Sequence, residues 1–146
     1  MTTETSVNWF YWALLSAGFA ALTAIFAKIG LEGVDSDYAT LVRTAVIFVV
    51  LAVMVVVLNK WQSPFTLSSK TMLFLVLSAL ATGASWLCYF RALKAGEASK
   101  VAPVDKLSVV LVAIFAVIFL GERPAWREWL GIGLVAIGVL VLGFKR

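Results

Sequence analysis

The chain has 146 residues, of which 62% are hydrophobic and 14% are charged. Because soluble domains average about 25% charged residues, this composition excludes an ordinary soluble domain and predicts an integral membrane protein. The net charge of +4 does not indicate a nucleic-acid partner, since the basic residues mostly flank apolar runs, where they report topology.

The sequence offers little material for metal or redox chemistry. It contains no histidine and one cysteine, Cys88, which lies within an apolar run. A disulfide within the chain and a metal site of Cys and His ligands are therefore excluded. We expect Cys88 to be a buried, inert thiol. We predict no cofactor and no bound metal.

Five apolar runs predict an all-α integral membrane protein with transmembrane helices over about residues 9–29, 38–58, 71–93, 97–120 and 124–144. Each run has the ~20 residues that a helix needs to cross a bilayer, which exceeds any ordinary strand. We expect Asp35 or Asp37 to cap the second helix, Gly121 to end the fourth and Pro124 to start the fifth. Together the helices are predicted to form a single membrane domain over residues 1–146.

The basic residues predict the orientation of the chain in the membrane. Five helices place the two ends of the chain on opposite sides. The side of the C-terminus has six basic residues, which are Lys28, Arg91, Lys94, Lys100, Lys145 and Arg146. The opposite side has four, which are Lys60, Lys70, Arg123 and Arg127. This excess favours a cytoplasmic (inner) membrane protein with its N-terminus outside and its C-terminus inside. Because the excess is small, dual topology is the alternative.

The fourth predicted helix has polar groups in its first turns. Pro103 lacks an N–H and its ring clashes with the preceding turn, so the carbonyl of Ser99 loses its helical partner. Such freed groups persist in a membrane only where protein or a water-filled cavity satisfies them. Asp105 and Lys106 follow, and charges inside a spanning helix are costly and usually functional. With Ser108, which shares a face with Asp105, they predict a wall of a polar cavity.

Residues of the second and third helices approach the same predicted depth. Arg43 lies roughly one and a half turns inside the second helix, where snorkelling to the near interface is the alternative interpretation. On the third helix, Thr82 and Tyr89 belong to one polar stripe with Trp86 beside it. Interhelical hydrogen bonding is an alternative role for that stripe. The convergence predicts a substrate-binding site composed of Arg43, Thr82, Trp86, Tyr89, Pro103, Asp105, Lys106 and Ser108.

Several segments resemble the EamA domain of the drug/metabolite transporter superfamily. They are residues 83–96, residues 98–103, the Leu-Gly-Glu at 120–122 and the glycine-rich last helix. The resemblance covers essentially the whole chain and is most specific over about residues 83–133. Members usually have two five-helix repeats of inverted topology, whereas this sequence contains one. It is therefore similar to the single-repeat members, which implies that a second copy in a homodimer, antiparallel or otherwise, or a second five-helix chain supplies the missing half.

The resemblance implies a secondary transporter of a small metabolite or drug, often an exporter, that alternates access by rocking of the repeats. One alternative is a small multidrug or lipid-carrier flippase, although the first helix has no intramembrane glutamate to hold a proton. An alternative of another class is a non-transporting subunit or scaffold. We expect no enzymatic activity, because histidine is absent and no paired carboxylates lie within the membrane. The expected partners are a small-molecule substrate and the lipid bilayer.

Overall fold

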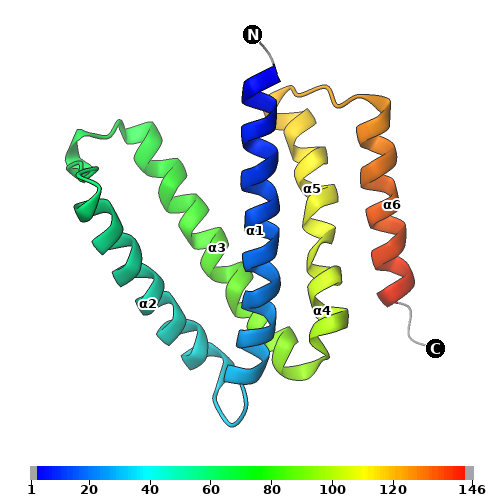
Figure 1. The fold of residues 1–146 in the computed structure, drawn as a ribbon, viewed down its shortest axis with the longest axis horizontal. Coiled ribbons are helices and arrows are strands. Elements are labelled where there is room, and N and C mark those ends of the chain that lie inside the picture. Colours follow the sequence, from blue (N-terminus) through cyan, green and yellow to red (C-terminus); the bar gives the residue numbers. More distant parts are fainter. Residues whose placement is uncertain (1–2, 144–146) are drawn as a thin grey trace. The chain divides into compact units, whose positions relative to one another are not determined.

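The computed structural model describes residues 3–143, and every regular element in this range is helical (Figure 1). The α-helices are α1 (Thr3–Gly30), α2 (Ser36–Val57), α3 (Ser69–Ala95), α4 (Ala98–Asp105), α5 (Leu107–Phe115) and α6 (Trp126–Gly143). A 3-10 helix, η1 (Pro64–Thr66), and a π-helix, η2 (Ala116–Leu120), complete the set. Five spans are long and apolar enough to cross a membrane, namely Trp9–Gly30, Ser36–Val57, Ser69–Ala95, Ala98–Leu120 and Trp126–Gly143. The prediction of an all-α membrane protein with five spanning helices is confirmed. The predicted helix end at residue 144 and the basic residues Lys145 and Arg146 lie outside the described residues.

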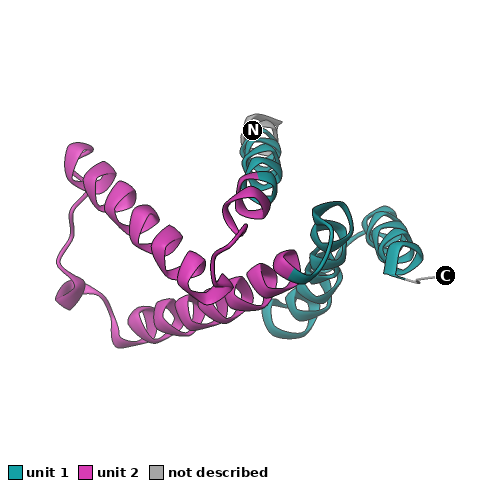
Figure 2. Ribbon diagram, turned by 90° about the horizontal axis from the view of Figure 1, so that it is seen from below, with its two compact units in different colours: residues 1–25, 95–146 teal, residues 26–94 magenta. Residues whose placement is uncertain are grey.

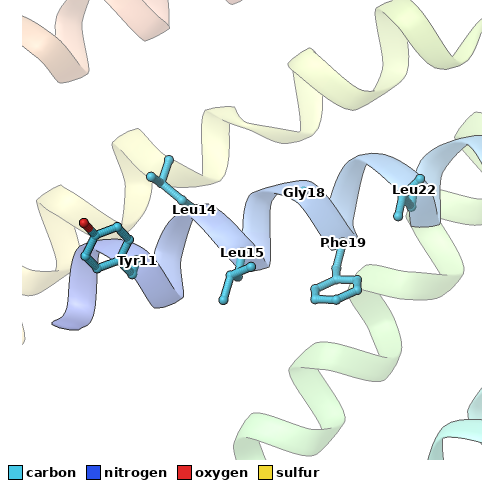
Figure 3. A pocket seen from close by; sticks show the side chains of 6 residues that line it. All are labelled: Tyr11, Leu14, Leu15, Gly18, Phe19 and Leu22. Carbon is cyan, nitrogen blue, oxygen red and sulfur yellow. The ribbon is translucent and has the colours of Figure 1, made fainter. Parts of the chain in front are cut away.

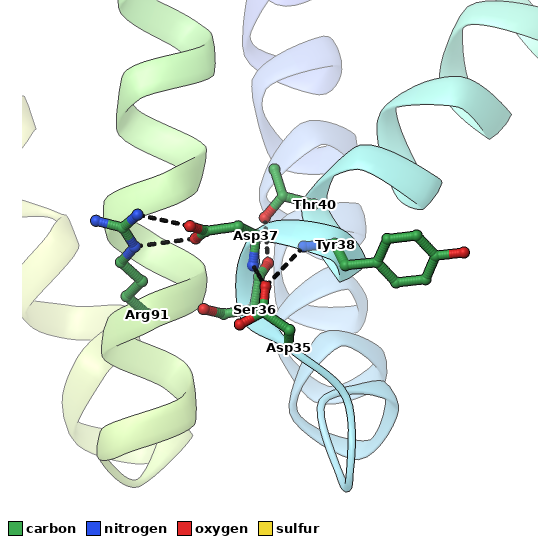
Figure 4. Close-up of polar contacts among 6 residues, drawn as sticks. All are labelled: Asp35, Ser36, Asp37, Tyr38, Thr40 and Arg91. Atoms are coloured by element: carbon green, nitrogen blue, oxygen red, sulfur yellow. Dashed lines mark hydrogen bonds and ion pairs between the residues drawn. The ribbon is translucent and has the colours of Figure 1, made fainter.

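The start of α2 is set by a side-chain cap. The Oδ1 atom of Asp35 accepts hydrogen bonds from the backbone N–H groups of Asp37 and Tyr38, at 2.9 and 3.1 Å (Figure 4). Such a cap satisfies N–H groups that the first turn leaves without helical partners. The helix consequently begins at Ser36, two residues before the apolar run. Of the two predicted caps, Asp35 is therefore the one that forms.

The fourth span is interrupted three residues after Pro103. α4 continues through Pro103, and the irregular residue is Lys106, whose N–H donates to the carbonyl oxygen of Pro103 at 3.0 Å. A bond to the third preceding residue makes a tighter turn than the α-helix, and this turn separates α4 from α5. The span then closes in a π-helical turn, η2, and ends at Gly121 with φ 67°. The left-handed conformation at Gly121 confirms the predicted end, because glycine adopts it without a Cβ penalty.

The start of α6 corrects a prediction. Pro124 lies in the connection before the helix, which begins at Trp126. The backbone N–H of Ala125 donates to Oε2 of Glu128 at 2.6 Å. A glutamate at this position commonly reaches back to satisfy an N–H at the helix start. This bond, rather than the proline, marks the first turn.

The contacts divide the chain into two compact units (Figure 2), one of residues 1–25 and 95–146 and the other of residues 26–94. In the first unit, α6 packs against α4 and α5.

Few apolar side chains are buried among the described residues, and these are Ala24, Leu31, Phe90, Leu93, Ala116 and Val139. Most of the apolar side chains are exposed on the helices, as expected of helices that lie in lipid. The prediction of a single domain stays a prediction.

Two lysines connect backbone segments at one end of the second unit. Lys28 Nζ, at the end of α1, donates to the carbonyl oxygen of Leu93 at 2.6 Å. Lys94 Nζ donates to the carbonyl oxygen of Val34 at 2.6 Å. The carbonyl of Leu93 belongs to the last turn of α3, where carbonyls lack helical partners and the helix dipole favours a cation. The lysines therefore fix the end of α1 and the loop after it against the end of α3.

We predict that Lys28→Met lowers the free energy of unfolding by about 1–3 kcal/mol, because it removes a charge-assisted hydrogen bond. Thermal unfolding of the detergent-purified protein measures this loss. Lys100→Met is the matched control, because Lys100 pairs with Glu97 one turn away on an exposed surface and such pairs contribute about 0–1 kcal/mol. Equal effects of the two substitutions would contradict a special role for Lys28.

Candidate functional site

Arg43 lies against aromatic rings of the neighbouring helix. Its guanidinium carbon is 4.5 Å from the centre of the Trp86 ring and 5.2 Å from the centre of the Phe90 ring. Both rings project from α3, one turn apart, and Arg43 is half-buried. The aromatic faces attract the cation through their quadrupoles. The structure thus brings together two residues of the predicted site, Arg43 and Trp86, and adds Phe90.

The other predicted residues of α3 have local partners. The hydroxyl of Thr82 donates to the carbonyl oxygen of Ser78 in its own helix, at 2.9 Å. This bond is typical of threonine inside an apolar helix, and it turns the hydroxyl toward its own backbone. Tyr89 is half-buried, and its ring meets that of Phe90 edge to face with centres 6.4 Å apart. Thr82 is therefore engaged within its own helix, whereas Tyr89 lies close enough to Arg43 to interact with its charge.

Sequence reasoning missed an ion pair beside this cluster. Arg91 donates from Nε and from its second terminal nitrogen to the two carboxylate oxygens of Asp37, at 2.9 and 2.6 Å (Figure 4). The fork of the guanidinium matches the carboxylate, which makes this geometry strong and specific. From the sequence, Arg91 is predicted only as one of the basic residues on its side of the membrane, and Asp37 only as a candidate cap of α2. The pair joins the first turn of α2 to the last turns of α3.

The remaining predicted residues lie in the other unit. Asp105 and Lys106 form an ion pair with each other, at 3.5 Å between Nζ and Oδ2. Pro103 and Asp105 are half-buried, whereas Lys106 and Ser108 are exposed. The long side chain of Lys106 bends back to the carboxylate of Asp105, and the role predicted for Lys106 in the substrate site stays a prediction. Since Arg43 belongs to the second unit, the predicted substrate site that contains both Arg43 and Asp105 stays a prediction.

A groove of about 660 Å³ runs along α1 (Figure 3), and Tyr11, Leu14, Leu15, Gly18, Phe19 and Leu22 line it. These residues recur at helical spacing, so they share one side of the helix. The lining is apolar apart from the hydroxyl of Tyr11, and none of the predicted site residues belongs to it. Such a surface suits lipid tails or a packed helix better than a polar substrate.

The described residues contain no group of His, Cys, Asp or Glu side chains that could hold a metal ion. Cys88 is exposed on α3, so the expectation of a buried thiol is wrong. An apolar run gives no signal of which side of a helix is covered. Within the described residues of the second unit, the contacts of the candidate site are those of Arg43 with the rings of Trp86 and Phe90.

Comparisons with known proteins identify what the chain is similar to. Residues 7–144 match the model of the EamA-like transporter family. The chain is 58% identical over 137 residues to an "Uncharacterized transporter in cobO 3'region" of Sinorhizobium sp. The matched residues cover 94% of this chain and 97% of that protein. It is 27% identical over 85 residues to a "Probable 4-amino-4-deoxy-L-arabinose-phosphoundecaprenol flippase subunit ArnE" of Yersinia pestis (strain Pestoides F), covering 58% of this chain and 75% of that protein. No solved structure matches.

Proposed function

Because the chain belongs to the EamA-like transporter family, we propose that it is a small-molecule secondary transporter, exporting a metabolite or drug, and not an enzyme. The observation that supports this most is the family match over residues 7–144, which includes all five apolar spans from Trp9 to Gly143. The substrate site in this proposal contains the eight residues predicted from the sequence.

We further propose that the chain works as a dimer of five-helix repeats. One repeat has one copy of the helices that a transporter of inverted repeats uses to build its central site. The apolar side chains exposed on the helices leave surface for a second copy as well as for lipid. A homodimer, antiparallel or otherwise, or a second five-helix chain would complete the site.

A lipid-carrier flippase is the second candidate, and one comparison favours it. The Yersinia relative is named as a flippase subunit for a sugar attached to a phosphorylated lipid carrier. Its match covers 58% of this chain, less than the 94% covered by the relative named as a transporter. We therefore place the exporter of a metabolite or drug first.

The orientation proposed for the chain is a cytoplasmic C-terminus in the inner membrane. We predict that reporters fused to the C-terminus read cytoplasmic in most molecules, because six basic residues lie on that side and four on the other. Moving two lysines to the other side should shift the ratio measurably, since the excess is small. A predominantly periplasmic reading of the unmodified chain would contradict the assignment.

A thermal-shift screen of metabolites on the detergent-purified chain tests the proposed function. A ligand that binds only the folded state stabilises it, by about 2.7 kcal/mol at a hundred times its Kd. We expect at least one class of small polar metabolite to raise the unfolding temperature. If a ligand binds only when a second five-helix chain is present, the result would instead favour the alternative that this chain is a subunit.

A further inference from the structure

The charge of Arg43 lies well inside a membrane-spanning helix. α2 begins at Ser36, and seven residues of α-helix place Arg43 about 10 Å along the axis. A charged side chain inside a spanning helix almost always pairs with an opposite charge or lines a polar pathway. The identity of the counter-charge of Arg43 is therefore a question about function.

The aromatic contacts hold the guanidinium without neutralising it. Trp86 and Phe90 lie 4.5 and 5.2 Å from its central carbon, and such contacts contribute about 0.5–2 kcal/mol. A guanidinium has five N–H donors, and carboxylate or phosphate oxygens are their preferred acceptors. The two rings supply no such oxygen.

None of the carboxylates of the same unit forms an ion pair with Arg43. Residues 26–94 contain three, Glu32, Asp35 and Asp37. Both oxygens of Asp37 accept from Arg91, and Asp35 caps α2 (Figure 4). Glu32 lies in the loop before the helix and is exposed. None of the ion pairs among the described residues includes Arg43. Its own unit therefore provides no counter-charge for Arg43.

From these contacts we infer that Arg43, held by Trp86 and Phe90, binds an anionic group, a carboxylate or a phosphate, of the transported molecule. The inference rests on the proposed function, because it names the substrate class of that same site. The rings exclude water from the faces of the guanidinium, and bound anion oxygens satisfy its N–H donors.

The test uses the full chain in a non-ionic detergent and follows its unfolding temperature. Sodium succinate and sodium glycerol 3-phosphate are the probes, with sodium chloride at matched ionic strength as the reference. We expect one or both probes to stabilise the native chain above chloride. In Arg43→Gln the apparent Kd for the probe should rise about tenfold or more, as loss of a charge-assisted pair implies.

Arg127→Gln is the matched control. Arg127 also lies over a tryptophan, with its guanidinium carbon 5.8 Å from the centre of the Trp126 ring, but at the start of α6. It should keep the anion response of the native chain. If Arg43→Gln does not fold, Trp86→Leu keeps the charge and removes its main stacking contact, and should also weaken the response.

Two results would overturn the inference. One is an anion response that is absent or independent of Arg43. The other is Arg43-dependent stabilisation only in nanodiscs containing phosphatidylglycerol, and not by the soluble probes, which would identify a lipid headgroup as the anion. Arg43-dependent anion binding without transport would overturn the proposed function and leave the anion site at Arg43 standing. Transport of a neutral molecule without an Arg43-dependent anion response would overturn the inference and leave the proposed function standing.

Discussion

Asp105→Asn should abolish transport while the protein remains folded. We propose that Asp105 faces the substrate cavity and binds a cationic part of the substrate or, should Arg43 show no anion response, pairs with Arg43. Asparagine keeps the shape of the side chain without its charge. The partner seen in the structure is Lys106, at 3.5 Å, with 37% of the Asp105 side chain exposed. A partly solvated pair of this kind contributes about 0–1 kcal/mol. Loss of transport at nearly unchanged stability is therefore the expected result in a transport assay paired with thermal unfolding.

A double substitution separates the two roles of Asp105. If Arg43 is its partner in the assembled transporter, Asp105→Asn leaves a buried charge unpaired and costs about 3–5 kcal/mol. Adding Arg43→Gln should then restore folding but not transport. Normal transport and unchanged stability in Asp105→Asn would show that the residue is an interfacial side chain and would remove it from the site.

Pro103→Ala should stabilise the protein and impair transport. Alanine restores the N–H that bonds the carbonyl of Ser99, and alanine is about 3 kcal/mol more favourable than proline inside a helix. We expect the turn at Lys106, whose N–H now bonds to the carbonyl of Pro103, to become regular and the span to straighten. Unfolding temperature and transport rate should change in opposite directions.

Pro64→Ala is the control for a general effect of removing a proline. Pro64 begins η1 in an exposed connection, so its replacement should leave the transport rate unchanged. If Pro103→Ala transports as fast as the native chain, the fold merely tolerates the irregular turn, and the proline has no part in the mechanism.

The lengths of the apolar runs predicted the five spans, because crossing a bilayer sets a minimum length that few other structures share. The ends of the helices were less predictable. α2 begins two residues early because the side chain of Asp35 caps it, and α6 begins after Pro124 because Glu128 bonds the N–H of Ala125. Caps are local side-chain bonds, and hydropathy contains no information about which of several candidates forms one.

The contacts of the candidate site were only partly predictable from the sequence. Counting residues from the ends of antiparallel helices placed Arg43 and Trp86 at a common depth, and they are in contact. Phe90 was missed although it lies one turn from Trp86, a spacing that puts both on one face. The Asp37–Arg91 pair joins residues 54 positions apart and depends on how α2 and α3 are rotated about their axes. A helix that is apolar all round does not specify that rotation.

Counterflow with the purified chain in liposomes tests the central claim most directly. Liposomes are loaded with an unlabelled ligand from the thermal-shift screen, and uptake of the labelled ligand is followed without any other protein. The proposed transporter should accumulate label transiently above the level of empty liposomes, and liposomes containing Asp105→Asn should not. Uptake no faster than in empty liposomes, by a chain that binds the same ligand and is folded, would contradict a transporter complete in copies of this chain.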